Sequence, residues 1–172
     1  MTCITSVMRK IAATGARARQ IEAGFTRPNA HAAAASARHN GTVLHDILSR
    51  VRVPSDLKAS TRQAVNSGDL EPSREREVLD LLSARIATHP EWFPEEGAQI
   101  LNETSLIDSD GREWRPDRVV IKDGEVTVID YKFGQKDPRY RTQVARYAAI
   151  YRKLGYKKVS TAIWYVPTGE VE

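Results

Sequence analysis

Hydrophobic residues in the first half of the chain recur at the spacing of an α-helix. Over residues 42–52 the apolar positions fall on one helical face, namely Val43, Leu44, Ile47, Leu48 and Val51. The same spacing predicts helices over residues 56–66 and 73–87, the second with Ser73 as its N-cap. We therefore expect a helical region before the first strand.

After residue 98 the pattern changes to the alternation that is typical of β-strands. It predicts strands over residues 99–106, 114–122 and 125–132, then a helix over 137–154 and a last strand over 158–166. The first three strands would form a meander, and the helix would return the chain for parallel pairing of the last strand. This order predicts an α/β fold with a mixed sheet flanked by helices.

Length and composition indicate one ordinary domain. The chain has 172 residues, 41% of them hydrophobic, and Cys3 is its single cysteine, so a disulfide framework is excluded and a reducing, bacterial cytoplasm is expected. No stretch approaches the ~18 consecutive apolar residues of a membrane span. We expect no membrane partner.

The positive charge is unevenly distributed. Residues 1–37 are Ala-rich and basic, and are predicted to be a low-complexity tail, disordered or loosely helical, ahead of a domain over residues 38–172. Their composition is also similar to that of an organelle transit peptide. Within the domain, the segment 132–158 carries nine basic residues against Asp137 alone. This segment, including Arg139 and Arg146, could hold a phosphate backbone.

The turn Asp123-Gly124 has a chemical consequence. It predicts a two-residue type I′ hairpin, and that register places Asp117 opposite Asp130. Opposed Cβ atoms lie about 4.5–5.5 Å apart, so two like charges would destabilise the strand pair. A divalent cation would remove this conflict. Strand alternation also puts Lys132 on the face of Asp130.

Two carboxylates and an ammonium group on one face suit phosphodiester hydrolysis. A bound metal would polarise the phosphoryl oxygen and activate a water molecule, and the lysine would stabilise developing negative charge. A structural salt bridge is the simpler reading, but two aspartates against one lysine leave charge in excess. A glycosidase also uses paired carboxylates, although the basic segment favours phosphate over sugar.

The residues around this hairpin resemble the motif of the PD-(D/E)XK nuclease superfamily. Pro116-Asp117, followed after twelve residues by Asp130-Tyr131-Lys132, has the spacing of that motif. Gln143 and Tyr147 match the Q-x-x-x-Y helix of RecB/AddA-type nucleases, and Gly41 to His45 resembles their G-x-x-x-H helix. Over residues 38–166 the closest likeness is to the C-terminal nuclease module of UvrD/Rep-type helicases, seen in R-P-D-R-V-V, V-I-D-Y-K-F-G and I-W-Y-V.

The resemblance implies a restriction-endonuclease-like sheet and a role for each matching residue. Asp117 and Asp130 would be metal ligands with His45 as an additional one, and Lys132 would be the catalytic lysine. Glu103, on the preceding strand, would be an accessory catalytic acid. Gln143 and Tyr147 would position the site or the DNA.

The resemblance also implies a cofactor and partners. The cofactor would be Mg²⁺ or Mn²⁺, the substrate DNA, and the setting a helicase–nuclease of recombinational DNA repair. The chain has no G-x-x-x-x-G-K-[ST] phosphate loop, so we expect the helicase to be a separate subunit or domain. The alternative is a catalytically inactive DNA-binding or protein-docking module of the same fold.

Overall fold

The computed structural model describes residues 30–172, and their side chains from residue 39 onward. The basic tail predicted over residues 1–37 lies outside this part up to residue 29, and residues 30–37 are helical. Three α-helices precede the sheet: α1 (Ala30–Arg50), α2 (Leu57–Asn66) and α3 (Glu75–Ala87). All three predicted helices are therefore present.

Two details of the helical region differ from prediction. Helix α1 begins at Ala30 rather than at residue 42, because the alanine-rich run before Gly41 has high helix propensity and continues the same helix. Ser73 is not an N-cap. It lies inside the short 3₁₀ turn Pro72–Arg74, which Pro72 opens at its first position, and Arg74 is the N-cap of α3. Further 3₁₀ turns cover Pro54–Asp56 and Pro90–Trp92.

The second half of the chain forms a five-stranded mixed sheet in the order β1-β4-β5-β6-β7. Its strands are β1 (Gln99–Asn102), β4 (Arg118–Lys122), β5 (Glu125–Lys132), β6 (Lys158–Tyr165) and β7 (Glu170–Val171). Strands β1, β4 and β5 are antiparallel neighbours, and β6 pairs parallel to β5 after the crossover helix α4 (Arg139–Lys153). The predicted meander, crossover and α/β class are confirmed.

Two predicted strands are each interrupted. The segment 99–106 stops at Asn102, because Glu103 takes a left-handed φ of 49° that turns the chain out of the strand. The segment 114–122 is broken before β4, where Pro116 has no N–H for a strand ladder. Between these breaks lies a separate hairpin of β2 (Leu106–Ile107) and β3 (Glu113–Trp114). The short strand β7 was not predicted.

The register predicted from the Asp123-Gly124 turn is confirmed. Val119 pairs with Val128, and Arg118 pairs with Ile129. The turn residues have φ values of 52° and 77°, as a type I′ turn requires. The turn lies at the other end of these two strands. Its register therefore fixes which residues lie side by side where β4 begins and β5 ends.

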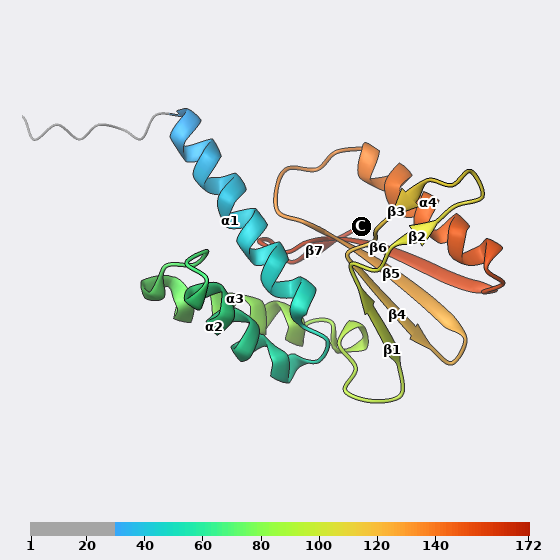
Figure 1. Ribbon diagram of the computed structural model, residues 1–172, viewed down its shortest axis with the longest axis horizontal. Coiled ribbons are helices and arrows are strands. Elements are labelled where there is room, and N and C mark those ends of the chain that lie inside the picture. The colour runs from blue at the N-terminus through green and yellow to red at the C-terminus, as the bar shows by residue number, and fades with distance from the viewer. Residues whose placement is uncertain (1–29) are drawn as a thin grey trace, which may run out of the picture.

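The sheet is covered on both faces (Figure 1). On one face α1, α2 and α3 pack against the sheet through a cluster that includes Ile47, Leu82 and Ile129. On the other face α4 contributes Tyr147 and Tyr151 to a cluster with strand residues such as Val119 and Val128. Trp92 and Phe93 are also buried. None of the helices in the described part of the chain is long and apolar enough to cross a bilayer.

Candidate metal centre and its lysine

Three acidic residues form a row across the end of the sheet where β4 begins. Glu103 directly follows β1, Asp117 directly precedes β4, and Asp130 lies in β5. The backbone N–H of Glu103 donates to the carbonyl of Asp117 over 3.1 Å, so the β1–β4 register extends by one more pair. A backbone N–H of β5, that of Tyr131, donates to Asp117 Oδ2 over 2.5 Å. Asp117 is thus held by hydrogen bonds from both sides, to Glu103 after β1 and to Tyr131 in β5.

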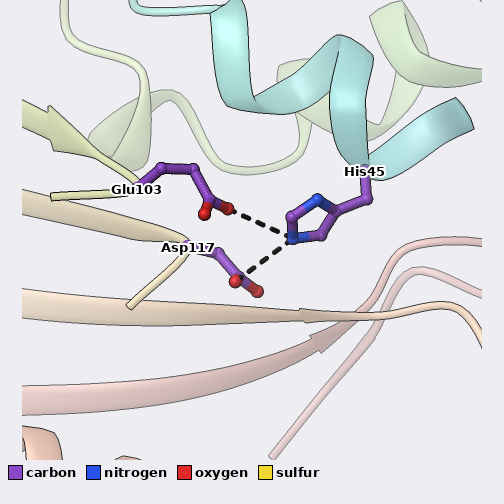
Figure 2. Close-up of side chains that lie close together, drawn as sticks. All are labelled: His45, Glu103 and Asp117. Atoms are coloured by element: carbon purple, nitrogen blue, oxygen red, sulfur yellow. Dashed lines mark ion pairs between the residues drawn. The ribbon is translucent and has the colours of Figure 1, made fainter. Parts of the chain in front are cut away.

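His45 of α1 completes a group of potential metal ligands. It comes from the helical layer that packs against the sheet. Its Nε2 lies 3.2 Å from Asp117 Oδ1 and 3.4 Å from Glu103 Oε1, as Figure 2 shows. One ligand atom from each of these three residues lies within 4.8 Å of the others. The set of one imidazole nitrogen and two carboxylates suits a divalent cation such as Mn²⁺ or Mg²⁺.

The protonation of this group reflects the crowding of acids. The hydrogen bond with Asp117 is the main cause that raises the pKa of His45. Burial, followed by repulsion from Asp117, raises the pKa of Glu103. Both shifts have the direction expected when negative charge is concentrated in a partly buried place. A cation bound here would replace the proton as the neutralising charge.

Gly41 explains how α1 comes close enough to place His45. A Cβ atom built at Gly41 would lie 3.0 Å from Cβ of Phe133, which directly follows β5. Residues four apart share a helix face. Gly41 and His45 therefore lie on the same face of α1, and that face lies against the end of β5. His45 also makes edge contacts with the rings of Tyr131 and Phe133.

Asp130 is the most buried acid of the row, at 1% exposure. Its Oδ2 forms an ion pair with Nζ of Lys132, and its Oδ1 has no hydrogen-bond partner among the described residues. Burial, together with the charge of Asp117, raises the pKa of Asp130 to about 6. An orphaned carboxylate oxygen next to the ligand group is a position that a cation or its bound water could fill.

Lys132 is linked to both residues of the predicted helix motif. Its Nζ lies 3.3 Å from Oε1 of Gln143 and 4.4 Å from the ring centre of Tyr140. Nε2 of Gln143 donates to the hydroxyl of Tyr147 over 2.8 Å, and that hydroxyl lies 3.4 Å from the carbonyl of Arg115. The ammonium group is therefore oriented by α4 as well as by Asp130.

The structure places the candidate site residues in two groups rather than one. The group that could hold a metal is His45, Glu103 and Asp117, whereas the predicted ligand Asp130 stands beside it, paired with Lys132. The backbone reversal at Glu103, which an alternating pattern does not reveal, moves this residue from accessory acid to potential ligand.

The two arginines predicted to bind DNA have different surroundings. Arg139 is 89% exposed and pairs with Asp137, two residues before it, and among the described residues it forms no ion pair with the site. The guanidinium of Arg146 lies 4.5 Å above the ring of Trp114, which contacts the ring of Tyr147 at 6.5 Å. Arg146 is thereby connected to the network of Lys132.

Sequence reasoning missed two residues that surround the site. Arg115 pairs through its Nε with Glu103 Oε2 at 2.8 Å. Arg118 is fully buried and donates hydrogen bonds to several carbonyl groups. The sequence offered one signal for Arg118. This charged residue directly precedes the apolar run Val119-Val120-Ile121, and strand alternation places it on the same face as Val120, the face that α1, α2 and α3 cover.

A scan of the chain against models of protein families finds no match, and a search of the curated proteins finds none either. The functional interpretation therefore depends on the arrangement of the side chains themselves. That arrangement brings three acids, a histidine and a lysine to one end of a sheet, from four separate elements.

Proposed function

We propose that this protein is a metal-dependent DNA nuclease with a restriction-endonuclease-like fold of the PD-(D/E)XK type. The observation that carries the proposal is the row of Glu103, Asp117 and Asp130, completed by His45 on one side and Lys132 on the other. A sheet does not retain three neighbouring acids for stability, because their repulsion opposes folding. A bound cation would offset that repulsion.

Each residue can then be given a chemical role. His45, Glu103 and Asp117 would hold Mg²⁺ or Mn²⁺, which when bound polarises a phosphoryl oxygen and lowers the pKa of a coordinated water. The buried carboxylate of Asp130 faces the same end of the sheet and orients Lys132. The ammonium group of Lys132 would stabilise negative charge on the phosphate as the bond breaks.

The surface beside the site supports a polyanionic substrate. A groove of about 200 Å³ runs between α4 and the β2–β3 hairpin, and three cations, Arg112, Arg146 and Lys153, line it together with Trp114. The groove also holds two carboxylates, Asp108 and Asp110, and Asp108 is already engaged by the indole N–H of Trp114 and by backbone N–H groups. Basic side chains next to an aromatic ring are typical of surfaces that bind a nucleic-acid strand.

We further propose that the domain works beside a helicase, in a separate subunit or domain, in recombinational DNA repair. The support is the likeness of R-P-D-R-V-V and V-I-D-Y-K-F-G to the nuclease module of UvrD/Rep-type helicases. Within this scheme the motor would deliver a single strand to the groove beside α4.

The experiment is cleavage of linear single- and double-stranded DNA by the purified chain, in Mg²⁺ or Mn²⁺ and in EDTA. We expect metal-dependent cleavage, and a decrease of about 10²–10³-fold in rate for Lys132→Ala, the loss typical of removing one group that stabilises transition-state charge. The matched control is Lys158→Ala, because Lys158 is an exposed lysine at the opposite end of the sheet, paired with Glu125. DNA binding without cleavage in any of these metals would support the inactive-module alternative instead.

A further inference from the structure

We propose that Arg118 and Asn102 form a clamp that sets the spacing of the three candidate metal ligands. The three ligands belong to different elements: His45 to α1, Glu103 to the end of β1 and Asp117 to the start of β4. A metal site requires these side chains to be held within a few tenths of an ångström of the productive geometry. The clamp residues are sequence neighbours of the two acids, Asn102 of Glu103 and Arg118 of Asp117.

Arg118 connects β4 to the end of the helix that carries His45. Its Nη1 donates to the carbonyl of Val51 and its Nη2 to the carbonyl of Arg52, each over 2.7 Å. Its Nε donates to the carbonyl of Trp92 over 2.7 Å, and its guanidinium lies 4.0 Å from the ring centre of Phe93. One side chain thus joins α1, the turn before β1, and β4.

Asn102 closes the clamp from β1. Its Nδ2 donates to the carbonyls of Ser49 and Val51 over 2.8 and 2.9 Å, and its Oδ1 accepts from Nη1 of Arg118 over 3.2 Å. Ser49 lies one helical turn after His45. Both clamp residues therefore hold the same end of α1, and each is attached by one peptide bond to an acid of the site.

The energetics favour a positioning role over simple packing. Arg118 is fully buried, and among the described residues it forms no ion pair with a carboxylate. Burying an unpaired charge is costly, and an apolar side chain of similar volume would often be more stable. What the guanidinium provides is a planar fork of donors, which reaches several carbonyls at once and which lysine does not reproduce.

The test measures metal binding rather than catalysis, and it depends on the proposed metal site. Mn²⁺ affinity would be followed by electron paramagnetic resonance, and the nitrogen coupling from His45 to bound Mn²⁺ by pulsed measurement. For Arg118→Lys, Arg118→Met and Asn102→Ala, we expect Mn²⁺ affinity to fall about 10–100-fold, the usual effect of removing a partner behind a metal ligand. The nitrogen coupling should weaken with it, while circular dichroism remains that of the folded protein.

The matched control is Arg85→Met. Arg85 also donates to two carbonyls, those of Val166 and Pro167, over 2.9 and 2.7 Å, but it joins α3 to the turn after β6. This variant should lower the melting temperature and leave Mn²⁺ affinity and the nitrogen coupling unchanged. A generic loss of stability would instead affect Arg85→Met and the clamp variants alike.

The outcomes separate the clamp from the proposed function. Folded Arg118→Lys and Asn102→Ala proteins with wild-type affinity and wild-type nitrogen coupling would overturn the clamp. If Arg118→Met does not fold, Asn102→Ala decides the question, since it removes only the half of the clamp on β1. A wild-type protein that binds Mn²⁺ through His45 but cuts no DNA would refute the nuclease and leave the clamp standing. A wild-type protein that binds no Mn²⁺ would overturn both.

Discussion

Replacing Asp130 by Asn should stabilise the metal-free protein, although it removes the carboxylate that pairs with Lys132. Asp130 is buried beside Asp117, and its pKa rises from 3.8 to about 6. At about 1.4 kcal/mol per pH unit, this difference corresponds to about 3 kcal/mol by which the ionised carboxylate destabilises the fold. Asparagine has nearly the same shape and does not ionise.

The size of the stabilising effect depends on pH. The pKa of Asp130 is higher in the folded state than in the unfolded state. The free energy of unfolding of the wild type therefore decreases as pH rises from about 4 to 6, and it stays at this lower value above pH 6. The substitution also removes the anion paired with Lys132, whose ammonium group retains Gln143 and the ring of Tyr140. The pKa of about 6 already includes the attraction of Lys132, which lowers it, so we expect a gain of up to about 3 kcal/mol at pH 8, and little difference at pH 4.

The assay is urea denaturation of both proteins in EDTA at several pH values between 4 and 8. Asp80→Asn is the control, because Asp80 is an exposed aspartate on α3 whose single ion-pair partner among the described residues is Arg76, four residues away. In saturating Mn²⁺ the order should reverse, since a cation stabilises the folded wild type more than the variant. A variant that is less stable than wild type at pH 8 in EDTA would refute the view that the acidic row is a conflict relieved by metal.

Two further predictions address the geometry and the protonation of the site. Gly41→Ala should weaken Mn²⁺ binding, although alanine favours helix, because its methyl group would lie 3.0 Å from Phe133; calorimetric titration would measure this. Gly134→Ala, whose added Cβ would meet nothing within 4 Å, should bind as wild type, and equal affinities of the two variants would contradict the close-approach argument. Apparent Mn²⁺ affinity should also rise as pH increases from 5 to 8, because the metal competes with the proton that Asp117 favours on His45. Affinity that is flat over this range would exclude His45 as a ligand.

The part of the fold that could be read from sequence is the part governed by local rules. Asp123-Gly124 permits only a tight hairpin, and a two-residue turn sets the register of every pair along β4 and β5. The alignment of Asp117 with Asp130 followed from that register alone. Strand β5 and the crossover to β6 were found for the same reason, since strand alternation and a helix that begins directly after a proline are short-range signals.

The rest of the site depends on packing between distant segments. The distance from His45 to Asp117 is set by how closely α1 approaches β5, and that approach depends on the missing side chain of Gly41. The left-handed turn at Glu103 is taken by a residue type that rarely adopts it, so no propensity predicts it. Arg118 was not predicted as a site residue because its backbone carbonyl partners lie 26 to 67 residues away in the sequence.

The most direct test of the proposed metal-dependent nuclease is the Mg²⁺ dependence of the initial rate at which the chain cleaves end-labelled linear DNA. Asp117→Asn would be compared with wild type and with Asp80→Asn at a temperature where all three are folded. We predict cleavage by wild type and Asp80→Asn that EDTA abolishes, and a rate lower by about 100-fold or more for Asp117→Asn, since metal stabilisation of the transition state contributes several kcal/mol. Cleavage that persists in EDTA, or an Asp117→Asn protein as fast as wild type, would contradict it.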